Sequence, residues 1–130
     1  MPNKFHGVEK REYSCYISEE LDEIVNYLIQ REDTKRVIFV RKAINYFLAS
    51  DRTVEPRVKN RKRNDPGYIK RGKLFVTYLE EEQKEQLKRV AEEQGCFLSQ
   101  VFFQVLLNYC AVLISLDSTC LLYTSDAADE

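Results

Sequence analysis

The chain carries one pattern of residues twice, in two stretches related by a shift of 62 positions. Each stretch reads as a short apolar strand, an amphipathic helix, a polar break and a second helix, over residues 11–49 and 74–113. The identical pairs are Tyr16/Tyr78, Glu19/Glu81, Glu20/Glu82, Glu23/Glu85 and Ala49/Ala111. The apolar pairs at the same shift are Ile17/Leu79, Val25/Leu87, Leu28/Val90, Val40/Phe102, Ile44/Leu106 and Phe47/Tyr109. A unit of about forty residues lies near the lower limit for folding alone. We therefore expect the two copies to pair, within one chain or between two chains.

The first copy begins with a strand over residues 12–17, in which apolar and polar side chains alternate. One face would carry Tyr13, Cys15 and Ile17, and the other would carry Glu12, Ser14 and Tyr16. Ser18 and the acidic residues that follow it are typical of the start of a helix. After a polar break at residues 31–33, Thr34 is expected to cap a second helix over residues 35–49.

The second copy is more apolar. Its strand, over residues 74–79, shows little alternation, which predicts a strand covered on both faces. Gly95 is suited to the left-handed position that ends a helix. The last helix is apolar on most sides, which is typical of a core helix.

A basic segment joins the two copies. Residues 52–73 contain nine Lys and Arg against Glu55 and Asp65, a net charge of +7. Two interpretations stay open: a charged tether in solvent, or a segment that neutralises phosphates, the main source of non-specific DNA affinity. As a flexible coil, the segment is long enough to let the two copies pair within one chain.

Composition excludes several classes of protein. No apolar run reaches the roughly 18 residues of a membrane span, and the N-terminal residues lack the apolar core of a signal peptide, so a cytoplasmic protein is expected. The four cysteines (Cys15, Cys96, Cys110 and Cys120) lack metal-site spacing, and buried free thiols are expected at the first three. With one histidine, His6, and no nucleophile–base set or glycine-rich phosphate loop, we expect no enzyme, no cofactor and no metal.

The C-terminal residues 120–130, CLLYTSDAADE, resemble the in-frame translation of a sequencing adapter. We therefore treat them as an artefact and expect the natural sequence to depart from this one after Thr119. The whole chain has 20 basic and 21 acidic residues. Without Asp126, Asp129 and Glu130, 20 basic residues face 18 acidic ones, and the net charge becomes +2.

The two copies resemble ribbon-helix-helix units, the Arc/MetJ/CopG-like DNA-binding family. The resemblance lies in ISEELDEIV and VRKAINYFL of the first copy and in LEEEQKEQLKRVAEEQG of the second. It implies a mainly α fold of two β-α-α units, whose strands pair into an antiparallel two-stranded ribbon over interlocked helices. The expected organisation is a flexible arm (1–10), a first unit (11–50), a basic linker (51–72), a second unit (73–116) and a tail (117–130).

The resemblance also implies which residues would face DNA. The outer ribbon face enters the major groove in that family, which would place Glu12, Ser14, Tyr16, Leu74, Val76 and Tyr78 toward the bases. The start of the second helix typically holds a phosphate, which assigns that role to Thr34, Lys35 and Arg36 and to residues 96–99. Leu74 and Val76 can touch only thymine methyl groups, so we expect the second strand to serve mainly as a folding partner.

The predicted function is a small sequence-specific protein that binds double-stranded DNA, as a transcriptional regulator or a mobile-element accessory factor. The predicted base-facing residues are Ser14, Tyr16 and Tyr78. The predicted phosphate-binding residues are Thr34, Lys35, Arg36, Arg61, Lys62, Arg63, Lys70, Arg71 and Lys73. Tyr16 and Tyr78 could instead pair with each other across the ribbon. The alternative function is a protein-interaction or assembly module that keeps the fold without binding DNA.

Overall fold

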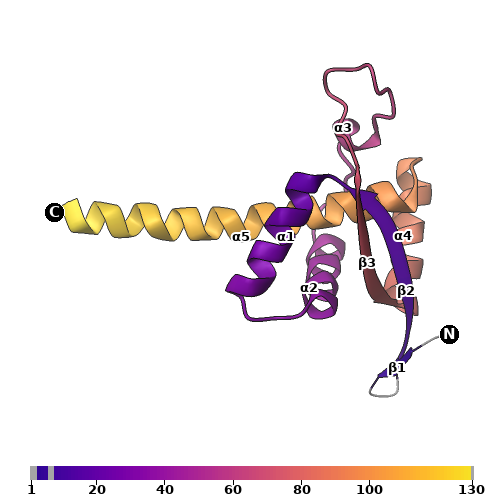
Figure 1. Cartoon of the computed structure of the whole chain (residues 1–130), viewed down its shortest axis with the longest axis horizontal. Coiled ribbons are helices and arrows are strands. Elements are labelled where there is room, and N and C mark those ends of the chain that lie inside the picture. Colours follow the sequence, from indigo (N-terminus) through magenta and orange to yellow (C-terminus); the bar gives the residue numbers. More distant parts are fainter. Residues whose placement is uncertain (1–2, 6–7, 130) are drawn as a thin grey trace.

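The expected mainly α class is confirmed: the computed structural model is 60% helix and includes an antiparallel sheet (Figure 1). It describes the backbone of residues 3–5 and 8–129, and the side-chain surroundings of residues 11–115. The elements in chain order are β1 (Asn3–Phe5), β2 (Val8–Ile17), α1 (Glu19–Arg31), α2 (Arg36–Ala49), α3 (Pro56–Lys59), β3 (Lys73–Glu80), α4 (Glu81–Gln94) and α5 (Leu98–Asp129).

The three described strands form one antiparallel sheet in the order β1-β2-β3. Its main part is the pair β2 and β3, two strands of the same chain, in register from Lys10 opposite Glu80 to Ile17 opposite Lys73. We call this pair the ribbon. A strand pair alone is marginal in water, so one face of the ribbon needs a covering layer.

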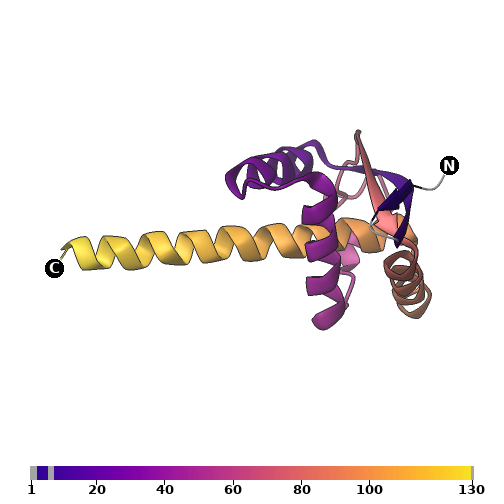
Figure 2. The ribbon, with the colours of Figure 1, turned by 90° about the horizontal axis from the view of Figure 1, so that it is seen from below.

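Helix α5 supplies that layer. The inner face of the ribbon carries Cys15, Ile17, Phe75, Thr77 and Leu79, all buried. The Phe102 ring of α5 lies 5.1 Å from the Tyr13 ring and 5.8 Å from the Phe75 ring, measured between centroids. Figure 2 shows α2 crossing α5, and α4 on the side of α5 away from β3. The core therefore surrounds the first half of α5.

Equivalent apolar positions of the two copies are buried alike. Both members of a pair are buried in five of the six apolar pairs: Ile17/Leu79, Val25/Leu87, Leu28/Val90, Val40/Phe102 and Ile44/Leu106. In the sixth pair, Phe47 is buried and Tyr109 is half-buried. The shift seen in the sequence thus corresponds to equivalent places in the core.

Several local signals behave as predicted. The backbone N–H of Leu21 donates to Ser18 Oγ at 3.2 Å, which confirms Ser18 as the N-cap of α1. Gly95 adopts the left-handed conformation (φ 65°) after α4, and the N–H of Cys96 donates to the carbonyl of Ala91 at 2.9 Å. Cys15 and Cys110 are buried free thiols, and burial raises the pKa of each to about 12.

Other local predictions are wrong. The N-cap of α2 is Lys35, without a side-chain hydrogen bond, and Thr34 instead donates its backbone N–H to the carbonyl of Ile29 at 3.1 Å. Strand β3 is covered on one face only, because its outer residues Leu74 and Tyr78 are exposed. The sequence of β3 lacks alternation because its exposed outer face carries apolar side chains as well as its buried inner face.

The ends of the chain also differ from the expected organisation. Of the arm expected at residues 1–10, residues 3–5 form β1 and residues 8–10 begin β2, while residues 1–2 and 6–7, with His6, lie outside the described part. The backbone of the tail expected at residues 117–130 continues α5 as far as Asp129, and Figure 1 shows this helix running past the other elements.

Among the described residues, one helix is long and apolar enough, by length and composition, to cross a membrane: residues 98–115 of α5. Within that stretch the consecutive residues 101–106 are all buried in the protein core. The core helix of a protein can have the length and composition of a membrane span, and 44% of this stretch is buried inside the protein.

Candidate nucleic-acid interface

The outer face of the ribbon is uncovered by the rest of the described chain. Glu12, Ser14 and Tyr16 of β2 are exposed. On β3, Leu74 and Tyr78 are exposed and Val76 is half-buried. These six residues, which we call the outer ribbon face, are the set that the strand pattern and the family resemblance placed there.

The register fixes which of these side chains are neighbours. Directly opposite pairs on the two strands are Glu12 with Tyr78, Ser14 with Val76, and Tyr16 with Leu74. Tyr16 and Tyr78 therefore stand toward different ends of the ribbon. A direct cross-strand pair between these two tyrosines is excluded by this register.

The chemistry of the outer ribbon face is mainly apolar. Tyr16 is 58% exposed, Leu74 48% and Tyr78 37%. The polar groups of the face are the hydroxyls of Ser14 and the two tyrosines and the carboxylate of Glu12. The face can thus make apolar contacts, donate hydrogen bonds through hydroxyls and accept them through one carboxylate.

The first part of the basic linker is held firmly against α4 and α5. The backbone N–H of Val54 donates to Gln94 Oε1 at 3.3 Å, and Val54 itself is buried. Lys59 Nζ donates to the carbonyl of Gln94 at 3.0 Å, and Gln100 Nε2 donates to the carbonyl of Lys59 at 3.2 Å. Val58 of α3 is also buried. Residues 54–59 are therefore packed structure, which corrects the interpretation of the whole linker as a tether.

The second part of the linker projects beyond the β3 start of the ribbon (Figure 1). Its exposed cationic residues are Arg61, Lys62, Arg63, Lys70 and Lys73. Among them, the Arg61 guanidinium carbon lies 4.8 Å from the centroid of the Phe97 ring. We call residues 60–73 the basic loop. It places positive charge beside Leu74, the residue that follows Lys73.

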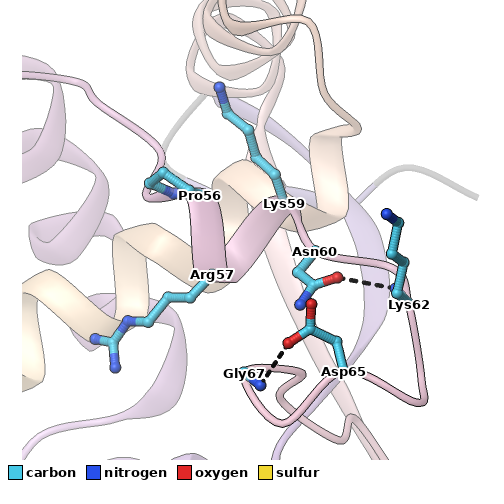
Figure 3. A pocket seen from close by; sticks show the side chains of 7 residues that line it. All are labelled: Pro56, Arg57, Lys59, Asn60, Lys62, Asp65 and Gly67. Carbon is cyan, nitrogen blue, oxygen red and sulfur yellow. Dashed lines mark hydrogen bonds between the residues drawn. The ribbon is translucent and has the colours of Figure 1, made fainter.

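A shallow hollow lies where α3 meets the basic loop (Figure 3). Asn60 Oδ1 accepts from the N–H of Lys62 at 2.9 Å, and Asp65 Oδ1 accepts from the N–H of Gly67 at 2.8 Å. The side chains of Arg57, Lys59 and Lys62 spread in different directions around it (Figure 3). The two hydrogen bonds thus hold the backbone of the basic loop. The cationic side chains around the hollow do not converge on a common point where a ligand could bind.

Arg71, predicted to bind phosphate, has contacts inside the protein. Its guanidinium carbon lies 4.8 Å from the centroid of the Phe103 ring, and Nη2 donates to the carbonyl of Val58. Desolvation by burial lowers the pKa of Arg71 from its ordinary value. Its Nε is buried without a hydrogen-bond partner among the described residues. We therefore assign Arg71 to anchoring the base of the basic loop.

Arg36, at the start of α2, is likewise engaged within the fold. Nη1 donates to the carbonyl of Val76 at 3.2 Å, and Nη2 donates to Asn26 Oδ1 at 3.1 Å. The guanidinium carbon stands 4.6 Å from the centroid of the Phe75 ring. Arg36 thus joins α1, α2 and β3, whereas its neighbour Lys35 is exposed and Thr34 is half-buried.

The start of α5 offers little to a phosphate. The N–H of Phe97 already donates to Gln100 Oε1 at 2.9 Å. Cys96 is half-buried and desolvation raises the pKa of its thiol, and the Phe97 side chain is exposed. Ser99 is also exposed. Of the two helix starts expected to hold phosphates, that of α2 therefore keeps the stronger cationic character.

The two ends of the ribbon differ in charge. The end at Ile17 and Lys73 meets the basic loop. Both ends lead into a helix with an acidic first turn: Glu19 and Glu20 of α1 follow the Ile17 end, and Glu81 and Glu82 of α4 follow the opposite end, where Glu81 Oε2 lies 3.6 Å from Arg11 Nε. The basic loop, present at one end only, therefore makes the difference in charge. A polyanion is therefore favoured at the end that carries Tyr16 and Leu74.

Sequence reasoning missed the polar contacts that hold the linker, because Gln94, Gln100 and Gln104 resemble ordinary helix residues. The one signal was the position of Gln100 and Gln104 within the otherwise apolar core helix α5, where Gln100 is 3% exposed and Gln104 1%. The described residues contain no group of His, Cys, Asp and Glu suited to a metal ion.

In comparisons with protein families, curated proteins and solved structures, nothing matches this chain.

Proposed function

We propose that this protein binds double-stranded DNA, with the outer ribbon face in the major groove and the basic loop on the phosphate backbone. The observation that carries the proposal is the position of the basic loop at one end of an uncovered two-stranded ribbon (Figure 1). A two-stranded ribbon has the width to enter the major groove. Lysine and arginine beside it supply the sequence-independent part of DNA affinity.

We further propose that the fold is a tandem ribbon-helix-helix arrangement. The element order β2-α1-α2 followed by β3-α4-α5 supports this proposal. The equivalent burial of the two copies supports it too. In this arrangement a single chain supplies both strands of the ribbon, so the DNA-binding unit would be a monomer. Its role would be that of a cytoplasmic transcriptional regulator or mobile-element accessory factor.

The contacts divide by position. Lys62, Arg63, Lys70 and Lys73 are exposed on the basic loop and would neutralise phosphates, with Arg61 supported by the Phe97 ring. Lys35 and Thr34 would meet phosphate at the start of α2. Ser14, Tyr16 and Tyr78 would face the bases. Arg36 and Arg71 leave the set of proposed DNA contacts because their guanidinium groups hold parts of the fold together.

A protein-interaction module is the second candidate, and one observation favours it. Tyr16 and Leu74 stand opposite each other and are both about half exposed. Exposed apolar clusters rimmed by polar residues are typical of protein-binding surfaces. DNA is preferred because its phosphates account for the basic loop and its base edges offer apolar contacts to Tyr16 and Leu74.

The test is binding of the full chain to mixed genomic fragments across a salt series. Replacing Lys62 and Arg63 by alanine should reduce the slope of log K against log salt by about 1.8, since each lost phosphate contact is worth about 0.9. The matched control is Lys88→Ala with Arg89→Ala, which removes the same charge from exposed positions on α4. The control should leave the slope unchanged.

Two results would contradict the proposal in different ways. Equal slopes for the wild-type chain and the Lys62/Arg63 variant would remove the basic loop from the interface. Absence of binding to any fragment at low salt would reject DNA binding and favour the protein-interaction module.

A further inference from the structure

We infer that the ribbon recognises the C5 methyl groups of pyrimidines, so that the preferred DNA is rich in thymine at the contacted positions. This inference rests on the proposed DNA binding and specifies what the ribbon would read. It gives Leu74 and Val76 of β3 a part in recognition, in place of the purely structural part that the sequence suggested for this strand.

The first step is the make-up of the outer ribbon face. It has two aliphatic side chains, Leu74 and Val76, and two tyrosines. The six residues include no arginine, lysine, asparagine or glutamine, the side chains that make bidentate hydrogen bonds to guanine and adenine. A face of this composition cannot depend mainly on hydrogen-bonded readout of purines.

The second step is the chemistry of the groove. The C5 methyl of thymine is the one apolar group that an unmodified base pair presents in the major groove. Leu74 is 48% exposed on the free ribbon, so it has apolar surface that such a contact would remove from water. Against a cytosine or uracil, the same side chain would meet a C5–H in place of the methyl group and would bury less apolar surface.

The third step is orientation. Leu74 directly follows Lys73 of the basic loop, and it stands opposite Tyr16. Both ends lead into a helix with an acidic first turn, Glu19 and Glu20 at this end and Glu81 and Glu82 at the other, so the basic loop makes the difference in charge. Electrostatic attraction between the basic loop and the DNA backbone therefore favours a pose in which the end with Leu74 and Tyr16 lies nearest the DNA. Ser14 and Val76, the next opposite pair, follow it along the groove.

The experiment compares duplexes of equal length and phosphate charge that differ in C5 methyl groups. One pair is an alternating adenine–thymine duplex and the same duplex with deoxyuridine in place of thymidine. The other pair is an alternating guanine–cytosine duplex with cytosine or with 5-methylcytosine. The full chain should bind the methylated member of each pair more tightly, by about fourfold for each contacted methyl group.

The test variant is Leu74→Ser, which removes an exposed aliphatic side chain from the ribbon. Its ratio of affinities for thymine over uracil DNA should fall by about fourfold. The matched control is Ile114→Ser, which removes an aliphatic side chain that is 39% exposed on α5. The control should keep the wild-type ratio, and circular dichroism should show both variants folded.

The outcomes separate this inference from the proposed function. Salt-dependent binding of all four duplexes with equal affinity would overturn methyl recognition and leave DNA binding intact. A thymine preference that persists unchanged in Leu74→Ser would also overturn it, since the most exposed aliphatic side chain of the face would then make no methyl contact. Binding of no duplex at low salt would reject DNA binding and methyl recognition together.

Discussion

Gln104 and Glu55 are joined by two hydrogen bonds. The backbone N–H of Glu55 donates to Gln104 Oε1 at 2.9 Å, and Gln104 Nε2 donates to Glu55 Oε2 at 2.7 Å. Gln104 is 1% exposed and also donates to Asn108 Oδ1 at 2.8 Å. One core glutamine of α5 thus fixes the position where the chain enters α3, and with it the base of the basic loop.

Replacing Gln104 by methionine should therefore destabilise the protein. Methionine keeps the length of the side chain but leaves the N–H of Glu55 without its partner, which costs about 1–3 kcal/mol in free energy of unfolding. Urea denaturation measures this loss. Gln30→Met at an exposed position of α1 is the control and should change the free energy of unfolding by less than about 0.5 kcal/mol. Equal losses in the two variants would contradict a clamping role for Gln104.

The same contact predicts a pH dependence of stability. The hydrogen bond from Gln104 is the main reason why the pKa of Glu55 lies below its ordinary value. The hydrogen bond and the charge of Arg57 lower this pKa further. A carboxyl whose pKa is lower in the folded state stabilises the protein above its unfolded pKa, and this contribution is lost as the pH falls through the folded pKa. The stability advantage of wild type over Glu55→Gln should thus shrink as the pH falls through the ordinary pKa range of a glutamate and below it.

Urea midpoints of both proteins across that range provide the measurement. Glu23→Gln, at an exposed position of α1, serves as the control for loss of one carboxylate. An advantage of wild type that stays constant or grows as the pH falls would show that the carboxylate of Glu55 is not stabilised by the fold.

Neighbouring cations at the start of α2 should respond differently to substitution. Arg36→Met removes the hydrogen bonds to the carbonyl of Val76 and to Asn26, and the contact with the Phe75 ring. It should lower the free energy of unfolding by about 1–2 kcal/mol. Lys35→Met, at an exposed position, should change it by less than about 0.5 kcal/mol.

For the salt dependence of DNA binding, we expect the larger effect from Lys35→Met and the smaller effect from Arg36→Met. Lys35→Met should reduce the slope by about one phosphate contact, because its ammonium group is proposed to meet the backbone. An Arg36→Met chain that keeps its stability and loses salt dependence would return Arg36 to the set of phosphate contacts.

The sequence revealed the parts of the fold that depend on local patterns. Ser18 and Gly95 mark helix ends through contacts a few residues away, and periodic apolar residues mark the buried sides of the helices. The outer ribbon face followed from the alternation in β2. In β3 the alternation was hidden, since Leu74 and Val76 are apolar although they lie on the outer face.

The parts that could not be predicted depend on contacts between distant residues. Arg36 and Val76 are 40 positions apart, and Glu55 and Gln104 are 49 apart. Nothing in either local sequence indicates the partner. A cation at a helix start and a cation in a basic run therefore both resembled phosphate ligands, although Arg36 and Arg71 bind backbone carbonyls of the protein.

A substitution at Thr77 is expected to raise the stability of the protein, whereas the substitutions above lower it. It is 2% exposed on the inner ribbon face, opposite Tyr13, and its Oγ1 has no hydrogen-bond partner among the described residues. A buried hydroxyl without a partner costs free energy, whereas valine has nearly the same shape without it. Thr77→Val should therefore raise the free energy of unfolding by about 1 kcal/mol. Thr77→Ser, which keeps the hydroxyl and loses the methyl group, should lower it by about 1 kcal/mol. Urea midpoints at unchanged m-values distinguish the two, and a loss of stability in Thr77→Val would show that the hydroxyl has a partner in solution.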